Sequence, residues 1–344
     1  MPGLTVTFGE IMLRLTPPGF ERILQSPQFV ATIGGAEANV AVALANFGAP
    51  AAYVTVLPDN NPVADAAVAQ LRAFGVDTSR IVRGKGRMGL YYLEAGANQR
   101  PSRVVYDREG SAIALAKPGD IDWDRALAGA AWFHLTGITP AISASAADLT
   151  FEAARKARAM GITVSCDLNY RKNLWKWGRP APEAMRELLG CADVAIVNEE
   201  HLRMAMGIAA AADTPPFAVD SDHFRALSAR ALAEWPNLRG IAMTLRESRS
   251  ASHNGWSACW SDGKDFVASR HYEITHIVDR VGGGDAFAAG LIYGLTTLPS
   301  AREALDFAVA ASCLKHSVPG DFNRFSAEEV LALVKGEGSG RVQR

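Results

Sequence analysis

Cysteine and closely spaced metal ligands are scarce in this chain of 344 residues. Its four cysteines include no Cys-x-x-Cys pair, and its seven histidines include no His-x-x-x-His spacing. These absences argue against a disulfide framework and a structural zinc site. Reduced, buried thiols in a cytoplasmic protein are the favoured interpretation of Cys166, Cys191, Cys259 and Cys313.

Long apolar runs and basic blocks are also missing. No stretch of about 18 apolar residues occurs, so no membrane-spanning helix is expected. The first residues lack the basic region and apolar stretch of a signal peptide, which agrees with a cytoplasmic location. The formal net charge is −1, which argues against nucleic acid as a partner.

Two common nucleotide-binding signatures are absent. The sequence has no Gly-x-x-x-x-Gly-Lys-Ser/Thr phosphate loop, and no Gly-x-Gly-x-x-Gly follows the first predicted strand. The second absence argues against a nicotinamide-dependent oxidoreductase, which a titration of cofactor absorbance would test.

Short β-rich segments alternate with helical patterns, which indicates a mostly parallel sheet covered by helices. The predicted core strands are residues 4–8, 52–57, 132–136, 163–167, 194–198 and 241–245. The predicted helices are residues 39–48, 62–74, 145–160, 222–234, 285–295, 301–315 and 327–335. We expect a single domain over residues 1–335 and a flexible tail over 336–344.

Two regions break this alternation. Residues 88–94 and 102–106 predict a hairpin that joins segments 11–15 and 29–32 in a small separate sheet. A small sheet attached to such a body suggests a lid, formed by about residues 10–32 and 86–112, over the carboxyl ends of the main strands. A second predicted hairpin comprises residues 256–260 and 266–269.

The most informative segment places three glycines before a carboxylate at the start of an apolar helix. Glycines let the backbone turn sharply and aim several N–H groups at one point, to which the helix adds its positive dipole end. This arrangement suits phosphoryl transfer to a hydroxyl group, whose proton Asp285 would remove. The alternative is a turn in which Asp285 only caps the helix. The segment reads Asp279-Arg280-Val281-Gly282-Gly283-Gly284-Asp285.

An earlier glycine pair, Gly34-Gly35, opens another predicted helix and is followed by Asn39. The glycines permit close approach of a ligand to the backbone, and Asn39 can both donate and accept hydrogen bonds. A tight turn with Asn39 as helix cap is the alternative.

These two elements, with a later Gly320-Asp321 pair, resemble the ribokinase-like (PfkB) family of carbohydrate kinases over about residues 6–334. The family implies a three-layer α/β/α fold with a central, mostly parallel sheet and a small β-sheet lid. Within the family the chain is most similar to kinases of 2-keto-3-deoxygluconate, through residues 34–37, 106–108, 135–140, 167–171 and 315–321.

The resemblance implies roles for individual residues. Asp285 would be the general base, the amides of Gly282, Gly283 and Gly284 the anion hole, and Arg171 part of the same catalytic group. The implied substrate-binding residues are Gly35, Asn39, Tyr91, Tyr106, Arg108, Arg171, Asp285 and Asp321.

Two arginines favour an acidic sugar. A substrate carboxylate suits the forked donors of Arg108 and Arg171, for which a neutral sugar has no use. The alternatives are surface salt bridges for both arginines and ordinary lid packing for Tyr91.

The nucleotide side matches the family less well. Members usually carry Asn-x-x-Glu, whose Glu helps to organise magnesium, but His201 stands at the fourth position here. Glu200 or Glu199 would substitute, or the acidic pair only favours a helix N-terminus. A usual Gly-x-x-Gly after Thr244 is also absent. ATP, Mg²⁺ and, as an open question, a monovalent cation such as K⁺ are implied, with ATP contacts from Asn198, Thr244, Arg246, Gly282, Gly284 and Asn323.

The sequence therefore predicts ATP-dependent phosphorylation of the terminal hydroxyl of 2-keto-3-deoxygluconate to its 6-phosphate, in sugar-acid catabolism of the Entner-Doudoroff type. A kinase of fructose or ribose and a non-catalytic sugar-binding protein of the same fold are the alternatives. Exposed strand edges of the lid favour a homo-oligomer.

Overall fold

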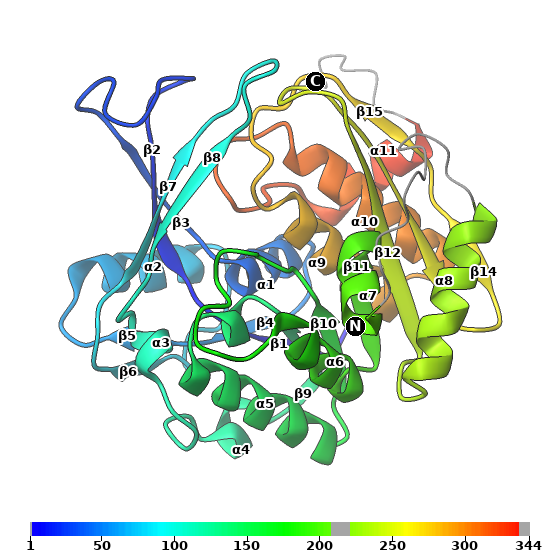
Figure 1. Ribbon diagram of the computed structural model, residues 1–344, viewed down its shortest axis with the longest axis horizontal. Coiled ribbons are helices and arrows are strands. Elements are labelled where there is room, and N and C mark those ends of the chain that lie inside the picture. Colours follow the sequence, from blue (N-terminus) through cyan, green and yellow to red (C-terminus); the bar gives the residue numbers. More distant parts are fainter. Residues whose placement is uncertain (1, 208–220, 337–344) are drawn as a thin grey trace.

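The computed structural model describes residues 2–207 and 221–336, and its centre is a nine-stranded sheet (Figure 1). The strand order is β14-β13-β12-β11-β10-β9-β1-β4, with β15 paired to β13. The strands from β4 to β12 in this order pair in parallel, whereas β13 pairs antiparallel with its three neighbours. These strands are β1 (Leu4–Phe8), β4 (Ala51–Val54), β9 (Ala130–Thr136), β10 (Thr163–Asp167), β11 (Val194–Asn198), β12 (Gly240–Ser248), β13 (Asn254–Ser261), β14 (Phe266–Ala268) and β15 (Tyr272–Ile274).

Helices cover both faces of this sheet and enclose two apolar cores. Successive strand residues point to opposite faces, so Val6 and Phe8 belong to the first core while Ala51 and Tyr53 belong to the second. Each fully buried side chain of this size stabilises the fold by about 1.5–3 kcal/mol. The first core is covered by α3 (Ala112–Leu115), α4 (Trp123–Ala126), α5 (Ala144–Ala159), α6 (Ala181–Cys191), α7 (Glu199–Met206) and α8 (Ser221–Glu234).

The second core is covered by α1 (Ala36–Asn46), α2 (Pro62–Ala73), α9 (Gly283–Thr297), α10 (Ala301–Lys315) and α11 (Ala327–Lys335). The predicted α/β fold with three layers, α/β/α, is thus confirmed. None of the described helices has the length and apolar character that crossing a bilayer requires.

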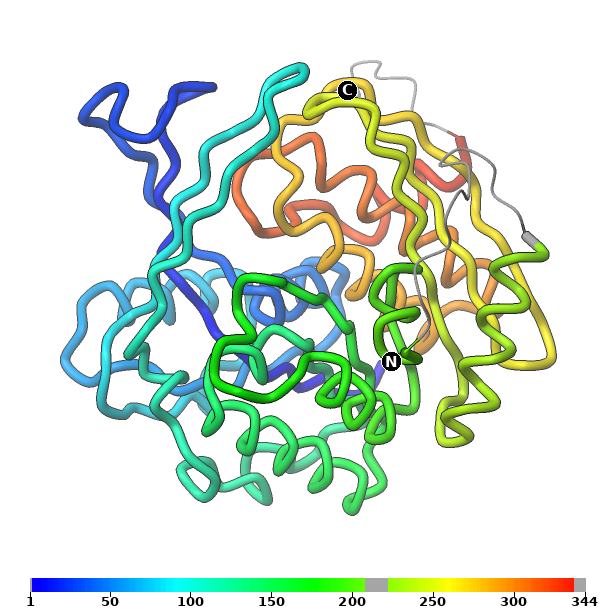
Figure 2. The backbone as a smooth tube through the Cα atoms, in the orientation of Figure 1, coloured from blue at the N-terminus to red at the C-terminus, as the bar shows by residue number. Residues whose placement is uncertain are grey.

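The predicted small sheet is also present and has the order β3-β2-β7-β8. Its blue and cyan strands rise away from the central sheet in Figure 2. Strand β2 pairs in parallel with β7, while β3 and β8 pair antiparallel at the two edges. The bounds are β2 (Met12–Thr16), β3 (Val30–Gly34), β7 (Gly89–Glu94) and β8 (Arg103–Asp107).

Several boundaries differ from the sequence prediction. The strand predicted over 52–57 is divided, because β5 (Val56–Pro58) leaves the central sheet and pairs with β6 (Val82–Gly84). Helices α1 and α9 begin a few residues early, since their glycines enter or precede the first turn. Residues 337–344 of the predicted tail lie outside the described residues.

Candidate active site

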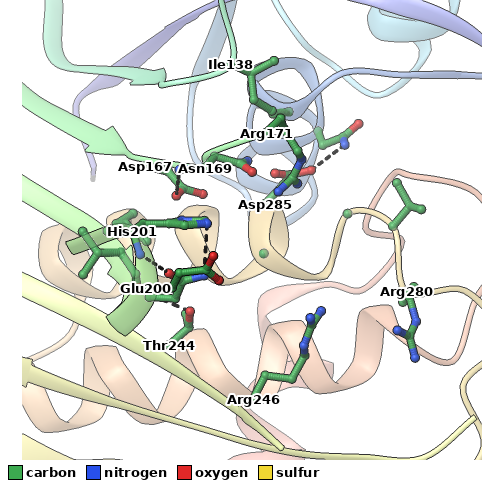
Figure 3. A pocket seen from close by; sticks show the side chains of 18 of the residues that line it. Ile138, Asp167, Asn169, Arg171, Glu200, His201, Thr244, Arg246, Arg280 and Asp285 are labelled. Atoms are coloured by element: carbon green, nitrogen blue, oxygen red, sulfur yellow. Dashed lines mark hydrogen bonds between the residues drawn. The ribbon is translucent and has the colours of Figure 1, made fainter. Parts of the chain in front are cut away.

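A cavity of about 1300 Å³ lies at the carboxyl ends of the central strands. Residues from β10, β11 and β12, from lid strands β7 and β8, and from the start of α9 line it. Open α/β sheets bind ligands at this edge. Figure 3 shows Asp285 beside Arg171, with Arg246 and Arg280 across the cavity.

Helix α9 begins at a glycine that no other residue can replace without strain. Gly282 has a left-handed φ of 84°, and a Cβ there would lie 2.0 Å from the carbonyl oxygen of Asp321. Within the described chain, the N–H groups of Gly282, Gly284 and Asp285 have no protein acceptor. Such groups in a first helical turn are ready to bind an anion.

The prediction for Gly283 needs correction. Its N–H donates to the carbonyl of Arg280 at 3.3 Å, and the residue does not line the cavity. Helix α9 begins at Gly283, two residues before the expected point, so this N–H lies in the turn that enters the helix. The donor set that faces the cavity is therefore Gly282, Gly284 and Asp285.

The carboxylate of Asp285 is buried in the first turn of α9 and is fixed by a neighbour. Its Oδ2 accepts a hydrogen bond from Asn39 Nδ2 at 2.7 Å. Burial raises the pKa of Asp285 to about 6, although the bond from Asn39 opposes this change. A carboxyl group with such a pKa can accept a proton near neutral pH.

Asn39 does not cap helix α1, which rules out the alternative role considered for it. The helix begins at Ala36, so Asn39 lies inside it and projects toward Asp285. Its Oδ1 also accepts the N–H of Gly35 at 3.2 Å. A Cβ on Gly35 would lie 2.1 Å from the carbonyl oxygen of Glu10. Only a glycine therefore allows the backbone at residue 35 to lie this close to the backbone of Glu10.

Two further carboxyl groups near Asp285, the buried Glu37 and the half-buried Asp167, were not predicted as functional. Burial raises the pKa of Glu37 to about 7, and hydrogen bonds from Thr136 and Thr139 oppose it. Burial also raises the pKa of Asp167 to about 7, and the charge of Asp285 adds to the effect. Both residues line the cavity. Only the position of Asp167 at the end of a core strand offered a sequence signal.

Arg108, the lid arginine, is paired with a carboxylate. The argument that two arginines are both available for an acidic sugar therefore needs correction. Arg108 lines the cavity, but its Nε donates to Glu10 Oε2 at 2.7 Å and its Nη2 donates to the same oxygen. Both side chains are buried. Nη1 alone has no acceptor among the described residues. The guanidinium also lies over the ring of Tyr106, 5.3 Å from its centre.

Tyr91 and Asp321 contact each other rather than open space. The Tyr91 hydroxyl donates to Asp321 Oδ2 at 2.6 Å, while Asp321 Oδ1 accepts from Arg14 at 2.8 Å. Arg14 also contacts Asp279 at 2.5 Å. Although both predicted residues line the cavity, their polar atoms are thus used to fasten lid strands β2 and β7 to the body.

Three arginines on the cavity wall lack carboxylate partners. Arg171, Arg246 and Arg280 form no ion pair with any described residue. Partial burial and repulsion from Arg280 and Arg171 lower the pKa of Arg246. Arg280 donates to the carbonyls of Ser250 and Ala251, yet its Nε is buried without a partner. Unpaired, mutually repelling cations around a cavity indicate an anionic ligand.

A family model described as "pfkB family carbohydrate kinase" matches residues 4–221 and 255–326. The chain belongs to this family. The match includes the cavity residues contributed by the lid, by β10 and β11, and by α9.

Relatives of this kinase-family chain include a 2-dehydro-3-deoxygalactonokinase of Haloferax volcanii, 32% identical over 97% of this chain and 98% of that protein. A 2-dehydro-3-deoxygluconokinase of Bacillus subtilis is 27% identical over 95% of this chain and 94% of that protein. The crystal structure of a 2-dehydro-3-deoxygluconokinase from Thermotoga maritima has a TM-score of 0.90 at 46% identity, over 97% of this chain and all of that one.

The residues predicted to contact nucleotide divide into two groups. Asn198, Thr244 and Arg246 line the cavity, although Asn198 also caps α7 by accepting the N–H of His201 at 2.7 Å. Thr244 donates to the carbonyl of Val197 at 3.3 Å. Asn323 is buried and is not among the residues that line the cavity, and its Oδ1 accepts the N–H of Phe325.

Glu199 and Glu200, the acidic pair at the start of α7, differ in whether their carboxylates have partners. Glu199 accepts from Arg203 at 2.7 Å and contacts His223 at 3.0 Å. Glu200 lines the cavity and has no hydrogen bond or ion pair with the described residues. Of the two, Glu200 therefore offers the free oxygen ligands that Mg²⁺ prefers.

Proposed function

We propose that this protein transfers the γ-phosphoryl group of ATP to the terminal hydroxyl of 2-keto-3-deoxygluconate (2-dehydro-3-deoxygluconate), giving the 6-phosphate. The observation that carries this proposal is the arrangement at the start of α9. Three unpaired backbone N–H groups and the buried carboxylate of Asp285 face one cavity.

Asp285 is the proposed general base. Asn39 fixes one of its oxygens, and the other is available for the substrate hydroxyl. With a pKa raised to about 6, Asp285 is mostly ionised at pH 7 yet basic enough to take a proton as the hydroxyl becomes nucleophilic. The N–H groups of Gly282, Gly284 and Asp285 would stabilise the transferring phosphoryl group.

Arg171 is the proposed partner of the substrate carboxylate. Its guanidinium lies beside Asp285 in Figure 3, and its charge lowers the pKa of that residue. Arg108 would add its free Nη1 from the lid, and Tyr106 would lie beneath it. Arg171 forms no ion pair with the described residues, so its forked donors remain available for a substrate carboxylate, which favours an acidic substrate.

The opposite wall of the cavity is the proposed phosphate side for ATP. Arg246 and Arg280 reach into it without carboxylate partners. Glu200 would hold Mg²⁺ through water, and the bound metal would neutralise phosphate charge. Asp167, whose carboxyl group is close enough to Asp285 for the two charges to interact, would help to orient the acceptor sugar.

The relatives differ in the configuration of one carbinol centre, since one is named for the galactonate-derived acid and two for the gluconate-derived acid. The galactonate-derived epimer is therefore the second candidate substrate. An assay of ADP formation with both epimers, fructose and ribose tests the proposal, with ³¹P NMR to place the phosphate. We expect a keto acid to be phosphorylated at its terminal hydroxyl. A preference for fructose or ribose would contradict the proposed function.

A second copy of the chain is the proposed partner of the lid. Large apolar side chains are exposed there, with Leu24 at 74%, Phe20 at 57% and Val30 at 55% exposure. Edge strands β3 and β8 also offer unpaired backbone groups. Pairing of two lids would cover both kinds of surface.

A further inference from the structure

A lysine is fully buried behind the N-terminus of α9. Lys315 ends helix α10, and none of its surface is exposed. Such burial is rare because desolvation of an ammonium group is costly. Its Nζ donates to the carbonyl oxygen of Val318 at 3.3 Å.

The stem of Lys315 packs directly against the anion hole. A Cβ on Gly282 would lie 3.2 Å from Lys315 Cε, so the lysine lies behind the glycine whose N–H opens the hole. The charge of Lys315 also lowers the pKa of Asp285. Lys315 is thus close enough to act on both the proposed donors and the proposed base.

Two carboxylates that share one arginine act electrostatically on this lysine. Arg14 contacts Asp279 at 2.5 Å and Asp321 at 2.8 Å. Asp279 also accepts the N–H groups of Val281 and Gly320, each at 3.0 Å. Burial lowers the pKa of Lys315, while the carboxylates of Asp279 and Asp321 oppose that change. The two negative charges are matched by Arg14 and Lys315.

We infer that Lys315 is a positioning residue that supplies, as part of the chain, the positive charge behind the anion hole, and that no monovalent metal ion is needed there. The oxygens of Asp279, Asp321 and Val318, which could otherwise ligate such an ion, already accept from Arg14, Lys315 and backbone N–H groups. A further cation would leave the buried network with unbalanced positive charge. The inference rests on the proposed kinase function only for its kinetic tests.

The first experiment compares potassium with an organic cation that is too large for the site. In choline chloride and potassium chloride of equal ionic strength, wild-type turnover is expected to agree within about twofold. Its thermal unfolding midpoint is expected to agree as well, and this measurement needs no activity. Turnover several-fold higher in potassium chloride, or a midpoint raised by potassium alone, would overturn the inference.

The second experiment removes the charge. Lys315→Met is expected to lower kcat about tenfold or more, because the anion hole loses its fixed positive support. The acidic limb of the pH profile is expected to move to higher pH, because the base loses a neighbouring cation. A merely structural role would not move this limb. Lys117→Met, at an exposed lysine, is the control.

The third variant opens the space that the side chain fills. Lys315→Ala is expected to gain a potassium-specific rise in unfolding midpoint, and partial recovery of turnover with ammonium or potassium ions. The inference would be overturned if Lys315→Met had unchanged kcat and an unchanged pH profile. It would also be overturned if the unfolding midpoint and turnover of Lys315→Ala did not depend on which cation is present. Wild-type protein inactive with every sugar acid would contradict the proposed function instead, and the unfolding midpoints would still decide this inference.

Discussion

At the scale of single residues, Asp285 carries the clearest expectation. Asp285→Asn removes the proposed base but keeps the size of the side chain, so turnover should fall by about a thousandfold while sugar binding persists. Steady-state kinetics and calorimetric titration of the keto acid would measure the two effects. Asp148→Asn, at an exposed helical position, serves as the control.

The same residue determines the expected pH dependence. Burial raises the pKa of Asp285 to about 6, and the base must be ionised to act, so kcat/KM should fall as the pH drops through about 6. Residual activity of Asp285→Asn should lack this limb. A wild-type profile that stays flat down to pH 4.5, well below that pKa, would contradict the assignment.

The two arginines of the acid site should respond differently to removal. Arg171→Ala is expected to raise KM for the keto acid with little change in stability, because Arg171 has no ion pair among the described residues. Arg108→Ala is expected to destabilise the fold by about 3 kcal/mol, because Glu10 would be left buried and unpaired. Equal losses of stability in both variants would refute this distinction.

At the scale of structural elements, the turn into α9 can be tested by one methyl group. Gly282→Ala places a Cβ 2.0 Å from the Asp321 carbonyl in a left-handed backbone, so the turn must move. We expect kcat to fall at least about a hundredfold through misplaced N–H groups. Gly284→Ala is the matched comparison, since a Cβ there meets nothing within 4 Å. Turnover of Gly282→Ala equal to that of Gly284→Ala would contradict the anion hole.

The elements also mark where sequence reasoning succeeded. Short apolar segments predicted the parallel strands and the lid hairpin. They could do so because the burial of a strand determines which of its residues are apolar, and this pattern can be read within a few residues. The glycine runs predicted where a ligand-binding helix starts, but not that Gly283 would turn its N–H toward Arg280. In the fold, Gly282 lies against Asp321 and Gly283 against His316, and both of these neighbours are remote in sequence.

Pairings between distant segments account for the remaining differences. Arg108 looked like a free substrate ligand because its partner, Glu10, is 98 residues earlier in the chain. Glu37 was given no role of its own from the sequence, and only the fold reveals its burial against Thr136 and Thr139. A sequence specifies residue types at a site more readily than which of them are already paired.

At the scale of the whole molecule, the buried carboxyl groups should make stability depend on pH. Burial raises the pKa of Glu37 to about 7 from 4.5, so its contribution is fully present below pH 4.5 and is lost as the pH rises through about 7. Glu37→Gln should therefore raise the free energy of unfolding at pH 8, by up to about 3 kcal/mol.

Denaturant unfolding of wild type and Glu37→Gln between pH 5 and pH 8, across the raised pKa of Glu37, would measure this difference. The variant's advantage should shrink toward the acidic end of that range. Glu328→Gln, at an exposed position in α11, should show no such trend. A constant or inverted difference would contradict the buried, proton-binding state of Glu37.

The association of two lids can be tested at the same scale. Leu24→Glu and Val30→Glu place charges on exposed apolar positions of the lid, and each should shift the protein toward monomer in light scattering. Met160→Glu, at an exposed position at the end of α5, is the control. A wild-type protein that is monomeric at all concentrations would refute the lid interface.

The cluster of Arg171, Arg246 and Arg280 has a practical consequence for handling the purified protein. With no carboxylate to balance them, these side chains attract any small multivalent anion in solution. Inorganic phosphate and sulfate buffers should compete with nucleotide and make ATP seem to bind more weakly than it does. The same anions should protect stored protein against heat, whereas exhaustive dialysis should leave it at its most fragile.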